Sequence, residues 1–184
     1  MKSKELRGKF LPYAIIVGFT LNFLLGLSGA LCPDNSLAQV ILWQGAMTCM
    51  ISACVLMGSY VAKRGWSLAA GGFVLLGIAH GGFYASLGLN SYNPVVMARG
   101  IIILIPSFIF IGMSNYFPPL LKWMSIAICI PFLTLYVRVL TGTYVFNELI
   151  QNISFTYLEI IAVLWGFNVW QELKRNKETE SQEP

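Results

Sequence analysis

Residues 146–170 read FNELIQNISFTYLEIIAVLWGFNVW, and this stretch decides the class of the protein. An α-helix needs about 20 predominantly apolar residues to cross the hydrocarbon core of a bilayer, and the run exceeds that length without a proline. Its apolar residues do not alternate with polar ones, as they would in a strand of a membrane barrel. The run therefore predicts a transmembrane α-helix.

Five earlier runs have the same character, and turn-forming residues such as Cys32-Pro33-Asp34-Asn35 separate them. The six runs predict an all-α fold, a polytopic integral membrane protein built as a six-transmembrane-helix bundle. We expect a single transmembrane domain over 1–172 and a charged cytoplasmic tail over 173–184. The predicted spans are about 11–31, 38–62, 67–89, 94–115, 119–140 and 146–170.

The composition supports this class. Charged residues make up 11% of the 184 residues, and hydrophobic residues make up 57%. A soluble domain carries about 25% charged residues, and a disordered chain is highly charged and poor in aromatic residues. The composition therefore excludes a soluble enzyme and a disordered chain.

Basic residues indicate the orientation, because cytoplasmic loops of membrane proteins carry an excess of lysine and arginine. With the N-terminus inside, the outer side keeps only Arg99 and Arg138, so we expect both termini in the cytoplasm and the bundle in a plasma or cytoplasmic membrane. The first span is longer than the ~7–15 apolar residues of a signal peptide, which predicts a retained helix and no cleaved signal. The inner basic residues are Lys2, Lys4, Arg7, Lys9, Lys63, Arg64, Lys122, Lys174, Arg175 and Lys177.

Polar residues in the last span form a stripe. At 100° per residue, Glu148, Gln151, Asn152 and Glu159 share an arc of about 100°. Polar groups in a membrane are costly unless they are paired or hydrated, so we expect this stripe to face the bundle interior. It is either a structural polar clamp or a functional site. The opposite face, which we expect to meet lipid, holds Leu149, Ile153, Leu158, Ile160 and Leu164.

Other spans also place polar residues at depth. His80 and Tyr84 lie on a face with Gly77 and Gly81, whose small size lets a neighbouring helix approach closely. Each of these polar side chains has two interpretations. It either packs between helices or anchors its helix at the membrane interface, or it takes part in a functional site. The remaining candidates are Asn22, Gln44, Arg99 and Arg138.

Most of these residues lie in the predicted outer half of the bilayer. This asymmetry predicts a polar cavity that opens to the outside, with Asn22 and Glu159 near its floor. We expect His80, Tyr84, Arg99 and Glu159 to line it together, with Arg99 meeting an anionic group of a ligand.

The sequence contains no catalytic, phosphate-binding or metal-binding motif. The four cysteines show no CxxC pair and the chain has one histidine, so we expect no metal and no cofactor. The basic residues flank the spans, which argues for contact with the lipid bilayer and against a nucleic-acid partner.

The leading functional hypothesis is a transporter or channel for a small polar or anionic solute, proton-linked through Glu159 and His80. One alternative is a subunit or assembly factor whose polar faces bind a membrane-protein partner or a second copy. The other is a membrane-embedded enzyme that uses His80 and Glu159 as acid and base on a lipid or extracytoplasmic substrate.

Overall fold

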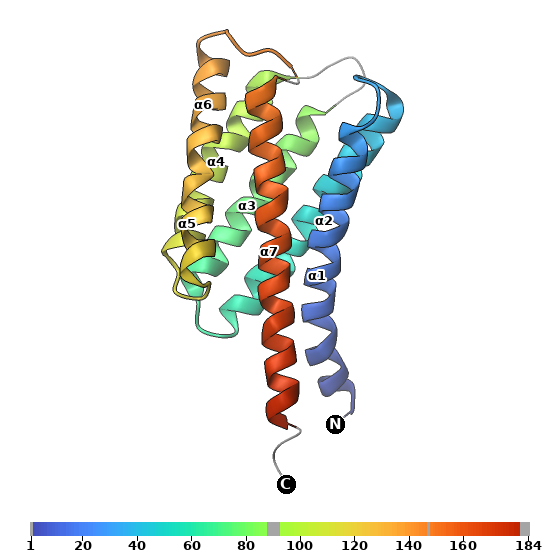
Figure 1. The fold of residues 1–184 in the computed structure, drawn as a ribbon, viewed down its shortest axis with the longest axis vertical. Helices are drawn as coiled ribbons and strands as arrows, with labels where there is room; N and C mark the ends of the chain where they lie inside the picture. Colours follow the sequence, from blue (N-terminus) through green and yellow to red (C-terminus); the bar gives the residue numbers. More distant parts are fainter. Residues whose placement is uncertain (1, 88–92, 147, 181–184) are drawn as a thin grey trace.

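A computed structural model describes residues 2–87, 93–146 and 148–180, and every regular element in these ranges is an α-helix (Figure 1). Six of its helical segments are long and apolar enough to cross a membrane, which confirms the multipass helical class. The helices are α1 (Lys2–Ala30), α2 (Leu37–Ala62), α3 (Ser67–Ser86), α4 (Pro94–Met113), α5 (Pro119–Ala127), α6 (Cys129–Leu140) and α7 (Leu149–Glu180).

Local sequence signals set several helix boundaries. The side chain of Ser36 caps α2 by accepting a hydrogen bond from the backbone N–H of Gln39 at 3.2 Å. Asn93 caps α4 in the same way, and Pro94 occupies the first turn, where its missing N–H costs nothing. The predicted end of the third span, at residue 89, lies outside the described residues.

The helices form a closed ring. Consecutive helices pack side by side from α1 to α4, α5 and α6 pack against α4 and α7, and α7 closes the ring against α1. The start of α1 and the end of α7 lie at the same end of the bundle (Figure 1). Trp165 of α7 fills the centre, where its ring lies 5.0 Å from that of Phe73 and 6.0 Å from that of Phe19.

The fifth span is two helices, because the regular pattern breaks at Ile128. Pro131 has no N–H to donate to the carbonyl four residues earlier, which weakens the helix at this turn. The predicted span over 119–140 is confirmed with these bounds, but its helix is interrupted within the span. The two segments still run in succession along one side of the bundle (Figure 1).

The last helix differs from its prediction in two respects. It continues to Glu180, so the first residues of the charged tail extend the transmembrane helix. The expectation that Leu158 faces lipid is wrong, since this side chain is buried. The reason is that α7 packs against α1 on one side and against α5 and α6 on the other, which buries a wider arc than the polar stripe alone. Leu149, Ile153 and Ile160 are exposed, as predicted.

Candidate functional site

A cavity of about 120 Å³ lies among α1, α2, α3, α4 and α7. It lies close to the helix ends joined by segments 31–36, 87–93 and 141–148, which is the half predicted to be outer. Among its lining residues, Ala30, Asn152 and Thr156 are also exposed, so the cavity reaches the surface between α1 and α7. Its walls include Gly26, Ala30, Trp43, Met47, Phe83, Met97, Gln151, Asn152, Phe155, Thr156 and Glu159.

Glu159 is the one ionisable side chain among the described lining residues. It makes no hydrogen bond or ion pair with any residue in the described ranges. A charged carboxylate near the middle of a bilayer costs about 2.5–3.5 kcal/mol on insertion scales. The carboxyl group of Glu159 is therefore available to whatever enters the cavity.

Gly26 makes the position of Glu159 possible. A Cβ atom at Gly26 would overlap the Glu159 carboxyl group, so only glycine lets this group lie against α1. The neighbouring backbone is held in place from α2, since the indole N–H of Trp43 donates to the Gly26 carbonyl at 3.3 Å. One glycine and one tryptophan thus shape the acidic corner of the cavity.

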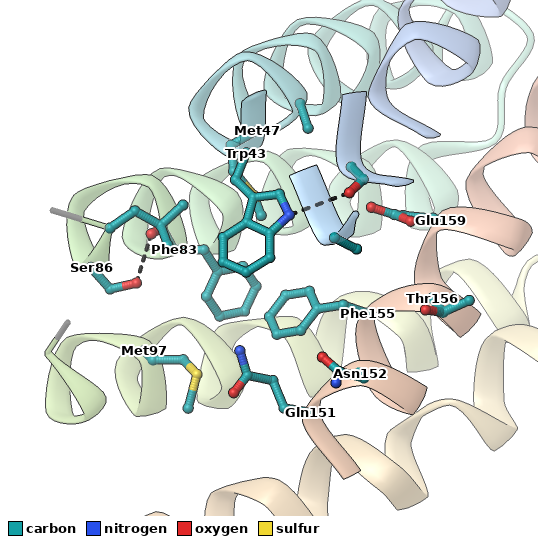
Figure 2. Close-up of a pocket in the computed structure, with 14 residues that line it drawn as sticks. Trp43, Met47, Phe83, Ser86, Met97, Gln151, Asn152, Phe155, Thr156 and Glu159 are labelled. Atoms are coloured by element: carbon teal, nitrogen blue, oxygen red, sulfur yellow. Dashed lines mark hydrogen bonds between the residues drawn. The ribbon is translucent and has the colours of Figure 1, made fainter. Parts of the chain in front are cut away.

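Aromatic rings form a further part of the wall, where Trp43, Phe83 and Phe155 lie close together (Figure 2). The Phe83 and Phe155 rings meet edge to face, with centroids 5.2 Å apart. Trp43 also contacts Phe146 of the segment before α7, with ring centroids 6.4 Å apart. The cavity therefore combines one carboxyl group with faces and edges of aromatic rings.

Two amides of the predicted stripe also line the cavity. Gln151 is buried, and its amide oxygen accepts a hydrogen bond from the Tyr144 hydroxyl at 2.5 Å. Asn152 lines the cavity but is exposed on its outer side. The polar stripe of α7 thus faces this cavity through Gln151, Asn152 and Glu159.

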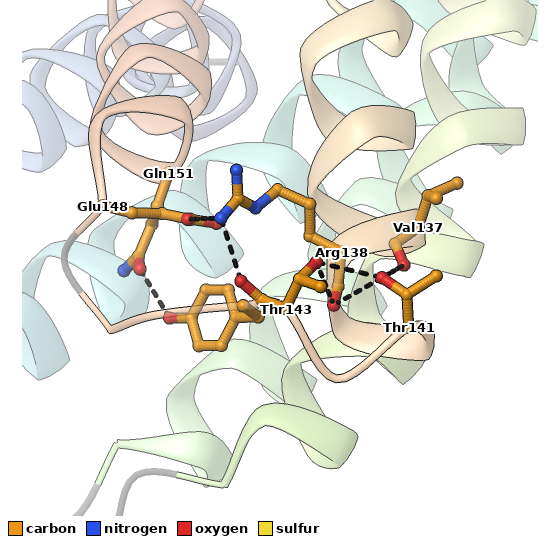
Figure 3. A network of polar contacts seen from close by, with 7 residues as sticks. Val137, Arg138, Thr141, Thr143, Glu148 and Gln151 are labelled. Atoms are coloured by element: carbon orange, nitrogen blue, oxygen red, sulfur yellow. Dashed lines mark hydrogen bonds and ion pairs between the residues drawn. The ribbon is translucent and has the colours of Figure 1, made fainter.

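Glu148, the fourth member of the stripe, pairs with Arg138 instead. One guanidinium nitrogen of Arg138 lies 2.8 Å from a Glu148 carboxylate oxygen and donates to the Thr143 carbonyl at 2.9 Å (Figure 3). These contacts tie the end of α6 to the start of α7. Arg138 and Glu148 therefore neutralise each other beside the cavity, and neither is among its lining residues.

His80 is buried but does not line the cavity. Its Nδ1 lies 2.8 Å from the Leu76 carbonyl, and because a carbonyl only accepts, Nδ1 carries the hydrogen. Its ring packs edge to face on Phe83 at 5.5 Å. The imidazole thus makes structural contacts within α3 and the core.

Tyr84 and Arg99 are exposed, which contradicts the expectation that they face one cavity with His80 and Glu159. The predicted face of α3 is correct at Gly77, where a Cβ atom would lie 3.6 Å from the Cβ of Cys54 in α2, and wrong at Gly81. Gly72 packs tightly on α4, whereas a Cβ atom at Gly81 would meet nothing within 4 Å. On α4, Gly100 rather than its neighbour Arg99 contacts α3.

Asn22 and Gln44 lie near the cavity without lining it. Asn22 is buried one helical turn before Gly26, and its amide nitrogen has no hydrogen-bond partner in the described ranges. Gln44 donates through its amide nitrogen to the Leu87 carbonyl at 3.3 Å, which links α2 to the end of α3. Both positions fit packing roles around the cavity.

A polar cluster lies at the other end of the bundle, and the sequence did not predict it. Glu172 of α7 accepts hydrogen bonds from the hydroxyls of Tyr60 and Tyr116, at 3.1 and 2.8 Å, and from Nε of Arg64 at 2.8 Å. The Arg64 guanidinium also lies 3.6 Å from the centre of the Tyr60 ring. We name these four residues the inner cluster, because the basic residues predict that this end of the bundle faces the cytoplasm. In the sequence, Arg64 signals only the orientation of the bundle, and Glu172 lies at the edge of the charged tail.

Burial and the hydrogen bond to Glu172 raise the pKa of Tyr116 above its ordinary value. Folding thus favours the neutral phenol. Its contribution to stability is fully present below a pH of about 10, which is the pKa of tyrosine in the unfolded chain, and is lost as the pH rises above that value. We expect Tyr116→Phe to lower the free energy of unfolding by about 1.5 kcal/mol at neutral pH. The difference from the wild type should narrow only in strongly alkaline solution.

Denaturant unfolding in micelles at several pH values measures this difference. Tyr136→Phe is the matched control, because Tyr136 makes no hydrogen bond through its side chain in the described ranges. Equal losses in the two variants would contradict a stabilising role for the inner cluster.

No group of three or more His, Cys, Asp or Glu side chains within the described ranges could hold a metal ion. Comparisons with protein families, with curated proteins and with solved structures found no match to this chain.

Proposed function

We propose that this multipass membrane protein is a transporter for a small solute, in which the outer-half cavity is the solute site. The observation that carries the proposal is the carboxyl group of Glu159, which lines the cavity without a protein partner. At this depth a proton or a bound cation must neutralise the carboxylate. Exchange of one for the other would link solute movement to proton movement.

The enzyme alternative receives less support. It requires His80 and Glu159 to act on one substrate, but only Glu159 is among the residues that line the cavity. The Nδ1–H of His80 is already engaged by the Leu76 carbonyl. An acid–base pair is therefore not assembled around a common space.

The experiment uses proteoliposomes loaded with the pH dye pyranine. We expect a pulse of at least one of tetramethylammonium, benzyltrimethylammonium, glycine and methanesulfonate to cause proton movement through the wild type. Glu159→Gln should abolish this movement because it removes the charge and keeps the shape. Glu178→Gln, at an exposed carboxylate near the end of α7, should keep it. A folded wild type that moves protons with none of the four solutes would refute the proposal.

The orientation belongs to the same proposal, with the cavity in the outer half and the inner cluster toward the cytoplasm. In a variant whose four native cysteines are replaced, we expect Asn35→Cys to react with an impermeant maleimide from outside the cell. Thr179→Cys should react only after the membrane is permeabilised. The reverse pattern would invert the bundle and show that the basic residues do not set its orientation.

A further inference from the structure

We propose that the solute is a small organic cation, an amine with one aromatic ring, whose ammonium group binds Glu159 and whose ring lies against Trp43, Phe83 and Phe155. This inference rests on the proposed solute site and names the class of molecule that the site takes.

The charge of the cavity favours a cation as the ligand. Glu159 is the one ionisable group among the described lining residues. Arg138 is paired with Glu148, and Arg99 is exposed and is not among the lining residues, so neither offers a counter-ion to an anion in this cavity. The earlier expectation of an anionic ligand at Arg99 is therefore not supported, and a cation is the complementary charge.

The aromatic residues of the cavity wall favour a ligand that has both a cationic group and a ring. Aromatic faces attract cations within about 6 Å of the ring centre, and tryptophan does so most strongly. Trp43 lines the same cavity as Glu159, and its indole N–H is engaged by the Gly26 carbonyl, which fixes the ring. Phe83 and Phe155 add apolar surface that a neutral hydrocarbon group can cover.

The size of the cavity limits the number of rings in the ligand. Its volume of about 120 Å³ is close to the ~150 Å³ of an engineered apolar cavity that accommodates benzene. One ring is therefore about the largest group that the cavity can hold, and a molecule of several fused rings would have to extend through the opening between α1 and α7. This limit favours a ligand with one ring and one short amine group.

Three ligands that share a ring and differ in charge test the proposal: benzylammonium, benzyl alcohol and benzoate. Binding to the full-length protein in micelles is measured by calorimetry at neutral pH. We expect benzylammonium to bind at least about tenfold more tightly than benzyl alcohol, since a hydrogen bond to a charged group has this value, and benzoate to bind most weakly. Equal affinities for the three, or tighter binding of benzoate, would overturn the proposal.

Variants then locate the site. Glu159→Gln should remove the preference for benzylammonium and leave benzyl alcohol binding unchanged, while Glu178→Gln should behave as the wild type. Trp43→Leu should weaken both ligands. The comparison of the three ligands uses only the wild-type protein, so it tests the proposal even if the Glu159→Gln protein fails to fold. Binding of benzylammonium, with no proton movement on a pulse of the permanently charged benzyltrimethylammonium in proteoliposomes, would keep the ligand class and refute transport. Failure of benzylammonium to bind would refute the ligand class.

Discussion

Gly72→Ala is expected to lower the free energy of unfolding by about 1–3 kcal/mol, the usual cost of forcing an extra methyl group into a packed core. A Cβ atom at Gly72 would lie 2.9 Å from the Ser107 carbonyl oxygen and 2.7 Å from Cγ1 of Ile111. The first of these is backbone of α4, which cannot move without separating the two helices. The same separation would stretch the 2.9 Å hydrogen bond from the Ser107 hydroxyl to the Gly72 carbonyl.

Gly71→Ala, at the adjacent residue, is the control for Gly72→Ala. A Cβ atom at Gly71 meets nothing within 4 Å, so Gly71→Ala should raise stability by up to about 1 kcal/mol through helix propensity alone. Unfolding of both variants by denaturant in micelles gives the comparison. Similar stabilities for the two would mean that α3 and α4 are not packed as closely as the structure has them.

The second large effect is expected at the acidic corner of the cavity. Gly26→Ala places a methyl group where the Glu159 carboxyl lies, and the carboxyl must move away from α1. Because the overlapping atoms are the far end of a flexible side chain, the bundle should fold with little loss of stability. Solute-driven proton movement should fall about tenfold or more, the value of one hydrogen bond to a charged group.

Gly81→Ala is the matched control for this substitution, since it adds the same methyl group in open space. Flux in pyranine-loaded proteoliposomes and the melting temperature are measured together. A Gly26→Ala variant with wild-type flux would show that the position of the carboxyl group against α1 has no part in the proposed activity.

The class of the fold could be predicted because it depends on length and composition along the chain. Six apolar runs bounded by turn residues are local signals, and the structure places six membrane-spanning helical segments on them. The continuation of α7 past residue 170 was harder to predict from the sequence, since a charged helix outside the bilayer resembles an unstructured tail in composition. Its stability is supported by contacts of Glu172 with α2 and with the segment after α4.

The site was only partly predictable, because the rotation of a helix depends on its neighbours. In the stripe of α7, Gln151 is buried and Glu159 lines the cavity, as expected from two carboxyls and two amides on one arc, whereas the expectation that Asn152 faces away from the surface is wrong because its side chain is exposed. For α3, glycines occur on several faces, and the sequence does not distinguish Gly72, which meets a neighbour, from Gly81, which does not. Tyr84 was assigned to the interior by this error.

One property of α7 links the two ends of the molecule mechanically. The helix is about 48 Å long from its 32 residues, and it contains no proline, so it resembles a stiff rod. Glu159 and Glu172 are mounted on this rod about 20 Å apart. Any twist of α7 that redirects Glu159 turns Glu172 by the same angle and strains its three hydrogen bonds. A spectroscopic label on Thr179, at the far end of the rod, would therefore sense from the water a rotation that begins in the middle of the membrane.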